Sequence, residues 1–128
     1  MIDNFIITKN KTIKEAMRLI NLNQHKCLIV VDKNKKLIGT LSDGNIRRAL
    51  LKNYTLDDKI NYIYNNNPKF ILKKNSSKEK LKSLFLKANF DIIPIIQDNR
   101  KVIDVTYWSK VFNDERKINK KKEYLPNI

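Results

Sequence analysis

Residues 27–39 read CLIVVDKNKKLIG, and residues 92–104, 65 positions later, read IIPIIQDNRKVID. Each stretch begins with an unbroken apolar run, Leu28 to Val31 in the first and Ile92 to Ile96 in the second, which is typical of a strand buried on both faces. Each continues with a short polar turn, DKNK or QDNR, and then a second strand. The sequence therefore predicts the same hairpin twice.

The repeat extends outward from both hairpins. A shift of 65 positions aligns residues 5–47 with residues 70–112 without a gap, beginning with FIITKN over FILKKN. Thr12 can cap a helix in the first copy and Ser77 in the second, and apolar residues follow each at spacings of three and four. Each copy is thus predicted to be a β-α-β-β-α unit of the α/β (α+β) class. We expect the two copies to pack face to face about a pseudo-twofold axis, with two related clefts between them.

The predicted boundaries divide the chain into three parts. Residues 1–65 hold the first repeat and its connector, residues 66–114 hold the second repeat, and residues 115–128 form a basic linker or tail. The basic cluster of the tail, RKINKKK, spans Arg116 to Lys122 and is interpreted as part of a linker, with a polybasic contact as the alternative.

The connector between the two copies is predicted to contain a helix. Its apolar residues Leu56, Ile60 and Ile63 recur at helical spacing. Two carboxylates, Asp57 and Asp58, fall in the first turn, where they favour the positive end of the helix dipole. Three tyrosines are interpreted as packing or subunit-contact residues, with stacking on bases as the alternative: Tyr54, Tyr62 and Tyr64.

Composition narrows the classes of function. The 128 residues carry 27 Lys and Arg against 13 Asp and Glu, a net charge of +14. The lysines are spread over every predicted element, so a solvated surface explains them better than a nucleic-acid partner does. Two glycines are too few for a glycine-rich dinucleotide or phosphate loop.

The remaining composition points to a chain without metal or catalytic residues. One Cys and one His cannot complete a zinc site. Cys27 opens an apolar strand and is interpreted as a packed residue rather than a nucleophile. His25 has no Ser or carboxylate at the spacing of a catalytic triad and is interpreted as non-catalytic. No run approaches a membrane span, and the N-terminus lacks the order of a signal peptide, so we expect a cytoplasmic protein with no membrane partner.

Both glycines of the chain lie within GTLSDGNIRR, residues 39–48, where a strand must turn into a helix. Ser42 or Asp43 can cap that helix, which is expected to begin near Asn45. Free first-turn amides beside arginine side chains make a good anion site, although the arginines could equally pair with Asp43 or with the carboxylates of the connector. The candidate ligand-binding residues are Ser42, Asp43, Gly44, Asn45, Arg47 and Arg48.

The first copy, from the helix TIKEAMRLI through CLIVVD to LIGTLSDGNIRR, resembles a CBS domain, and residues 5–112 resemble a tandem CBS pair, the Bateman module. The linking stretch LDDKINYIYNNNP and the Pro in IIPII are similar to CBS pairs that precede sugar-phosphate nucleotidyltransferase domains. CBS pairs attached to sugar-phosphate isomerases are similar in the same motif, and they are the alternative to the nucleotidyltransferase group. The resemblance implies a non-catalytic regulatory module that senses an adenine nucleotide (AMP, ADP or ATP) weakly, forms a homodimer, or both; a ligand-free dimerisation module is the other interpretation.

The resemblance also implies roles for individual residues. In nucleotide-binding members of the family, a Ser or Thr and an Asp three residues later hold the ribose hydroxyls, and basic residues that follow meet the phosphates; the matching positions here are Ser42 and Asn45. Asn lacks the charge that strengthens a carboxylate hydrogen bond. In the second copy no ribose contact is expected, and Tyr107 and Trp108 are expected to fill the second cleft or face a partner. The residues there that correspond to Gly39, Ser42 and Asn45 are Asp104, Tyr107 and Lys110.

Catalysis is expected to lie outside these residues. After residues 115–128, a protein of the nucleotidyltransferase group would enter the first strand of its catalytic domain and a glycine-rich nucleotide loop. We therefore expect this polypeptide to be the regulatory piece of such an enzyme, ending at the domain boundary.

Overall fold

The structure is a computed structural model that describes residues 2–112. In the first copy, a short 3-10 helix (η1, Ile2–Phe5) precedes five elements in the predicted order: β1 (Ile6–Thr8), α1 (Ile13–Asn23), β2 (Cys27–Val31), β3 (Leu37–Ser42) and α2 (Asp43–Leu51). The second copy repeats that order: β4 (Ile71–Leu72), α3 (Lys78–Lys87), β5 (Ile93–Ile96), β6 (Val102–Thr106) and α4 (Trp108–Val111). The predicted fold class is confirmed.

Each copy builds one three-stranded sheet with its second strand in the centre. In the first sheet β1 runs parallel to β2, with Ile6 opposite Ile29, and β2 runs antiparallel to β3. In the second sheet β4 runs parallel to β5, and β5 pairs antiparallel with β6. The central strands β2 and β5 are buried along their whole length, as their unbroken apolar runs predict.

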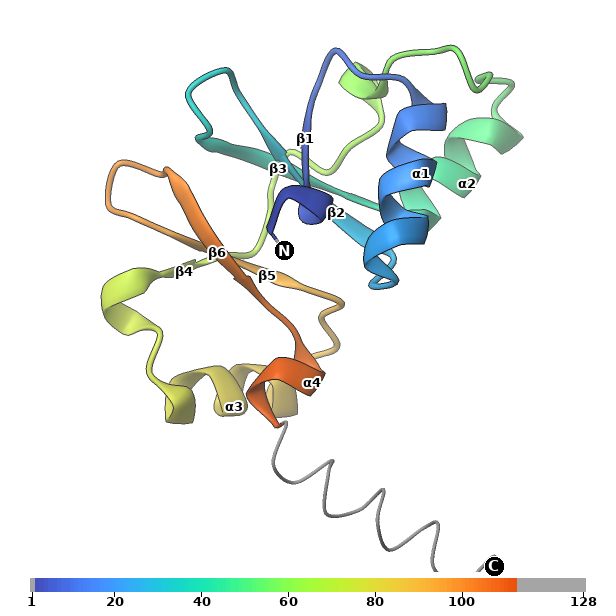
Figure 1. Ribbon diagram of the computed structural model, residues 1–128. Helices are drawn as coiled ribbons and strands as arrows, with labels where there is room; N and C mark the ends of the chain where they lie inside the picture. Colours follow the sequence, from blue (N-terminus) through green and yellow to red (C-terminus); the bar gives the residue numbers. More distant parts are fainter. Residues whose placement is uncertain (1, 113–128) are drawn as a thin grey trace, which may run out of the picture.

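The two sheets face each other, and the helices cover their outer faces (Figure 1). The core between the sheets takes side chains from both copies, including Phe5, Ile29, Ile96, Val102 and Val105. Separate apolar clusters lie between the first sheet and α1 and α2, and between the second sheet and α3 and α4. The predicted face-to-face packing is therefore present.

The hairpin turns show the symmetry of the pair most directly. The N–H of Leu37 donates to the carbonyl of Arg100 at 3.0 Å, and the N–H of Val102 donates to the carbonyl of Lys35 at 3.0 Å. Leu37 corresponds to Val102 and Lys35 to Arg100 in the repeat, so each bond is the image of the other about a pseudo-twofold axis.

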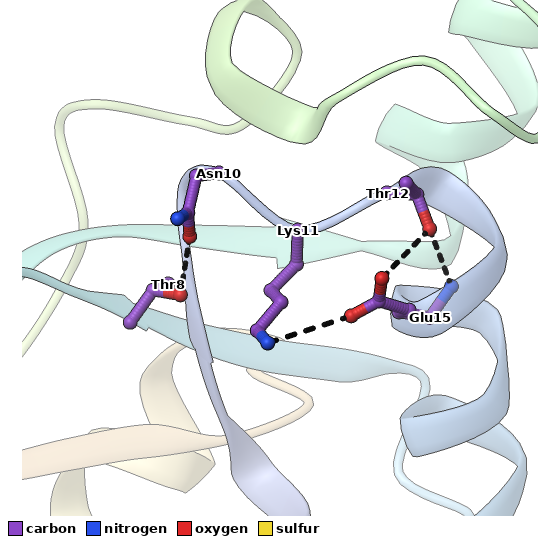
Figure 2. A network of polar contacts seen from close by, with 5 residues as sticks. All are labelled: Thr8, Asn10, Lys11, Thr12 and Glu15. Carbon is purple, nitrogen blue, oxygen red and sulfur yellow. Dashed lines mark hydrogen bonds and ion pairs between the residues drawn. The ribbon is translucent and has the colours of Figure 1, made fainter.

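The predicted caps of the first helix in each copy are present. The N–H of Glu15 donates to Oγ1 of Thr12 at 3.2 Å, and Lys11 forms an ion pair with Glu15 at 3.8 Å (Figure 2). In the second copy the N–H of Lys80 donates to Oγ of Ser77 at 3.3 Å. Both side chains satisfy an amide that the first helical turn leaves without a partner.

The prediction of a helix in the connector with two carboxylates in its first turn is wrong. The connector has a 3-10 turn at Ile60–Tyr62 (η2), and Asp57 and Asp58 precede it. The carboxylate of Asp58 accepts from the N–H of Thr55 at 2.6 Å. An α-helix does not form because the connector donates and accepts backbone hydrogen bonds with the start of α1 instead; for example, the N–H of Ile13 donates to the carbonyl of Asp58 at 2.9 Å.

Two further observations concern membrane spans and the tail. Within residues 2–112 no helix has both the length and the apolar character needed to cross a bilayer. The predicted tail, residues 115–128 with the basic cluster Arg116 to Lys122, lies outside the described residues.

Candidate functional site

The candidate site begins where β3 passes into α2. Ser42 is the last residue of β3 and the N-cap of α2, with the extended backbone (φ −96°, ψ 162°) that caps adopt. The helix begins at Asp43, two residues earlier than expected, so Gly44 and Asn45 lie inside its first turn. The sequence prediction of a capped strand-to-helix turn is confirmed, with Ser42 as the capping residue.

Ser42 and Asn45 form a reciprocal capping box. The N–H of Asn45 donates to Oγ of Ser42 at 3.0 Å. In return, Oδ1 of Asn45 accepts from the N–H of Ser42 at 2.8 Å and from its hydroxyl at 2.9 Å. The two positions that the family resemblance singles out therefore hold each other in place at the start of α2.

This box decides which group Asn45 can offer to a ligand. Its carbonyl oxygen already accepts two hydrogen bonds, whereas its Nδ2 amide has no partner within residues 2–112. An amide N–H is a donor, so Asn45 is set to donate to a ribose or phosphate oxygen. An Asp at the same position would keep the box with one oxygen and offer the other as an acceptor.

Fewer backbone amides are available for an anion than the sequence suggests. The N–H of Asp43 donates to the carbonyl of Lys26 at 2.8 Å, and the N–H of Asn45 is taken by Ser42. The helix N-terminus still carries its partial positive charge, but side chains must supply most of the donors for a bound phosphate.

The two arginines have different surroundings. Arg47 pairs with Asp43, its Nη1 lying 3.1 Å from Oδ2, and both side chains are mostly exposed. Arg48 runs back along the helix, so its Nη1 lies 3.2 Å from the place where a Cβ on Gly44 would be. Within residues 2–112 Arg48 has no ion pair, and it is the arginine that remains available for a phosphate.

Asn45 and Arg48 line a cavity of about 170 Å³ between α2 and the connector. The other side chains that matter for binding there are Lys52, Tyr54 and Tyr62, and Tyr62 is 85% exposed. Sequence reasoning missed Lys52, although its spacing of four from Arg48 places both cations on one helix face. The cavity is smaller than the roughly 300–1,000 Å³ of complete ligand pockets.

Gly39 has a structural role that the sequence did not reveal. The connector crosses directly over it, and a Cβ at this position would overlap the ring of Tyr64 and the carbonyl oxygen of Asn65. Next to it, Thr40 and Asn65 exchange two backbone hydrogen bonds of 3.0 and 2.8 Å. Gly39 therefore allows the close approach of the connector, and Tyr64 is a packing residue.

The second copy lacks the capping box. Tyr107 caps α4 without a side-chain hydrogen bond. The centroid of its ring lies 4.0 Å from that of His25 and 5.8 Å from that of Phe5, so it packs between the copies. Lys110, at the position of Asn45, is held by Asp104 at 3.1 Å and by the carbonyl of Val105 at 2.9 Å. Nothing in this arrangement reproduces the Ser42–Asn45 pair.

A cavity of about 290 Å³ lies between the copies. The first copy contributes His25 and Lys26, and the second contributes Phe90, Asp91 and Trp108. Trp108 stacks on Phe112 with ring centroids 4.2 Å apart and is 41% exposed, so it forms a wall of this space without closing it.

The titratable groups near this cavity show no catalytic arrangement. Burial lowers the pKa of His25, and the Asp91 carboxylate partly opposes that shift. Burial, reinforced by Asp91, raises the pKa of the Cys27 thiol to about 12, which leaves the thiol protonated and unreactive at neutral pH. Among residues 2–112 no cluster of His, Cys, Asp and Glu could hold a metal ion.

One family and several curated proteins are similar to this chain. The family described as CBS domain matches residues 1–52. An uncharacterized protein of Helicobacter pylori (strain J99) is 30% identical over 104 residues, which are 80% of this chain and 31% of that protein. An uncharacterized protein of Rickettsia prowazekii is 29% identical over 94 residues, which are 73% of this chain and 29% of that protein. The chain spans about a third of the length of these curated relatives.

Solved structures extend the likeness to both copies. The CBS-pair protein CBSX2 from Arabidopsis thaliana has a TM-score of 0.72 at 18% identity, over 92% of this chain and 90% of that chain. CBSX2 in complex with AMP has a TM-score of 0.73 over 91% of each chain, again at 18% identity. Staphylococcus aureus OpuCA has a TM-score of 0.73 at 16% identity, over 89% of this chain and 93% of that chain. Residues 1–52 thus match the CBS domain family, and the two copies together have the fold of these CBS-pair structures.

Proposed function

We propose that this chain is a non-catalytic regulatory CBS pair that binds an adenine nucleotide weakly at the start of α2. The capping box of Ser42 and Asn45 carries the proposal, because it presents the Asn45 amide near Arg48, which has no ion pair within residues 2–112, at the positive end of a helix. The likeness of the fold to CBSX2, which has been solved in complex with AMP, supports the choice of ligand.

The cavity beside Asn45 suits the sugar and phosphate part of such a ligand. Arg48 and Lys52 can meet the phosphate, and the Asn45 amide can donate to a ribose oxygen. Because the cavity holds about 170 Å³, the base must lie outside it, where the exposed ring of Tyr62 offers a stacking surface.

The position of this site suggests how binding could be transmitted. Its walls come from α2 and from the connector, and the connector joins the two copies. A nucleotide that holds α2 and the connector together favours one arrangement of the pair, and a neighbouring domain can respond to that arrangement.

The catalytic partner implied by the resemblance, a sugar-1-phosphate nucleotidyltransferase, remains part of the proposal. Since the chain spans about a third of its curated relatives, those relatives have room for a further domain. Assaying the longest protein encoded by the gene for pyrophosphate release from a nucleoside triphosphate and a sugar 1-phosphate, with and without AMP, tests this assignment. Release that AMP alters supports it, and a protein with no such activity contradicts it.

Homodimerisation is the second candidate function, and exposed apolar side chains favour it. Leu22 on α1, Leu51 on α2 and Leu86 on α3 are 63%, 78% and 70% exposed. Light scattering over a range of protein concentrations tests this candidate. A dimer that nucleotides leave unchanged supports a structural module, whereas a monomer at all concentrations contradicts it.

Isothermal titration calorimetry with AMP, ADP, ATP and GTP, up to millimolar ligand, tests nucleotide binding. We expect at least one adenine nucleotide to bind the wild-type chain and to bind the Ser42→Ala variant more weakly. Ser77→Ala is the control, because it removes a serine N-cap from a different helix, α3 in the second copy. No binding of any of the four nucleotides would contradict the proposal, as would equal effects of the two variants.

A further inference from the structure

The strand β1 has one edge without a partner strand. In the order β1-β2-β3 it pairs on one side only, with β2. The opposite edge of the sheet differs, because Thr40 of β3 forms a bridge with Asn65 of the connector. Within residues 2–112 no such bridge covers the outer side of Ile6, Ile7 or Thr8. The connector thus covers part of one edge of the sheet, and the described residues leave the edge at β1 unpaired.

This edge presents backbone groups to a further strand. Successive residues of a strand turn their N–H and C=O groups to alternate sides, so at least one of the three residues of β1 directs both groups away from β2. The carbonyl of Thr8 accepts from the N–H of Lys11 at 3.2 Å. Within residues 2–112 no other hydrogen bond outside the sheet uses a backbone group of β1. An unpaired edge of this kind is a template for strand addition.

A groove of about 380 Å³ lies along the same edge. All three residues of β1 line it. The side chain of Ile7 packs with α1 in the cluster of the first copy, whereas that of Ile6 packs on the core between the sheets. A groove that contacts residues pointing to both faces of a strand borders the edge of that strand. Its volume falls within the roughly 300–1,000 Å³ of ligand pockets.

The other wall of the groove comes from α1 and the residues that lead into it. Leu19 is half-buried and packs on the apolar cluster of the first copy. Lys11 and Glu15 form an ion pair at 3.8 Å, which Figure 2 shows beside Thr8, the last residue of β1. Arg18 is exposed and has no ion pair within residues 2–112. The groove therefore combines an apolar surface with one cation that awaits a partner.

We propose that this groove binds an extended, acidic segment of a partner protein, which pairs with β1 as an additional strand. Backbone hydrogen bonds to β1 fix the register of the segment. One of its apolar side chains lies against Ile7 and Leu19, and a carboxylate two residues along, on the same face of the segment, meets Arg18. The net charge of +14 favours an acidic partner as well.

The groove is separate from the proposed nucleotide site. It shares no residue with the cavity beside Asn45, so the inference does not depend on nucleotide binding. The second copy also offers an edge strand, β4, but its sequence differs at the charged positions. Ser83 stands in the repeat where the first copy has Arg18, and Lys80 stands where it has Glu15. The edge of β4 is therefore a control within the same molecule.

NMR of the nitrogen-15-labelled 128-residue chain tests the proposal, with a capped Val-Thr-Glu-Thr-Val peptide added to millimolar concentration. In an extended peptide the Val and Glu side chains share one face. We expect the amide signals of β1 (Ile6–Thr8) to shift and those of β4 (Ile71–Leu72) to stay in place. The same peptide with N-methylated backbone amides cannot donate to β1 and should bind about tenfold more weakly. No shift in β1, or equal binding of the two peptides, overturns the proposal.

A pair of variants tests the role of the arginine. Arg18→Glu should weaken binding of the same peptide by about tenfold, because a repulsive charge replaces an attractive one. Lys80→Glu makes the same change of charge at an exposed position in the second copy and should alter the affinity by less than about twofold at physiological salt. Equal losses for the two variants would mean that the peptide responds only to the net charge of the chain, which would overturn the proposal.

Discussion

The two copies share one topology but differ at the helix that follows the second strand of each hairpin. In the first copy Ser42 and Asn45 cap a helix of nine residues, whereas in the second Tyr107 offers no side-chain cap and α4 has four residues. Both copies keep the buried central strand and the apolar face of the preceding helix. Both copies therefore form the same fold from the same apolar pattern. The candidate site depends in addition on two capping residues, which only the first copy has.

The copies also differ at the position of Gly39. The connector closes the first copy through Ile60 and crosses over Gly39, so it belongs structurally to that copy. In the second copy Asp104 replaces the glycine and binds Lys110. The position that lets the connector cross the first copy thus carries a side chain in the second.

The largest expected effect is on the connector anchor. Ile60→Ala should lower the free energy of unfolding by about 3–4 kcal/mol, because it leaves a cavity at a completely buried position. Denaturant unfolding followed by circular dichroism measures this loss. Leu51→Ala, at a side chain 78% exposed, is the control and should change stability by less than about 0.5 kcal/mol. Similar losses for both variants would mean that the connector does not stabilise the first copy.

The next largest effect is expected at Gly39. Gly39→Ala should cost about 2–3 kcal/mol of stability, because the new Cβ overlaps the backbone of Asn65, which cannot move aside without the connector. Thermal unfolding of the variant measures the effect. A variant as stable as the wild type would show that the connector does not approach so closely.

Gly44 is the matched control for Gly39. A Cβ there would lie 3.2 Å from the end of the Arg48 side chain, which is exposed and can move. Gly44→Ala should therefore stabilise α2 by about 0.5 kcal/mol, since alanine loses less backbone entropy in a helix than glycine does. Opposite signs for the two alanine variants are the expected result.

A smaller effect is expected at the cap. Ser42→Ala should cost about 1 kcal/mol, because it removes one half of the capping box. Amide hydrogen exchange in the first turn of α2 should become faster, while exchange in α3, which Ser77 caps, should not change. Unchanged exchange in α2 would contradict the role of the box.

The smallest expected effect concerns pH. Because burial lowers the pKa of His25 in the folded chain, the unfolded chain takes up a proton more readily. Stability should therefore fall as the pH drops below the ordinary histidine pKa of 6.5. Comparison of unfolding at pH 7.5 and pH 5.5 for wild type and His25→Gln measures this contribution. An identical pH dependence for the two chains would contradict it.

The sequence predicted most of the fold because the apolar pattern carries it. The central strands, the caps at Thr12 and Ser77 and the face-to-face packing all follow from apolar spacing and local capping chemistry. The connector was predicted wrongly because Leu56, Ile60 and Ile63 have helical spacing, yet long-range backbone pairing with the start of α1 overrides that local preference.

The sequence predicted the capped turn at the candidate site but not the geometry of its side chains. Spacing indicated Ser42 as a cap, but it could not show that the side-chain carbonyl of Asn45 already accepts two hydrogen bonds from Ser42. Nor could it show that Arg47 pairs with Asp43 while Arg48 stays available. These outcomes depend on side-chain orientation, which sequence spacing does not determine.

The most direct test of the proposed nucleotide site is the affinity of Asn45→Asp for AMP, measured by calorimetry beside the wild type. The carboxylate can keep the capping box with one oxygen and accept a ribose hydroxyl with the other, so the hydrogen bond to the ligand becomes charge-assisted. The gain of about 1 kcal/mol predicts roughly fivefold tighter binding. An affinity that is unchanged or weaker would contradict the assignment of Asn45 to the ribose position.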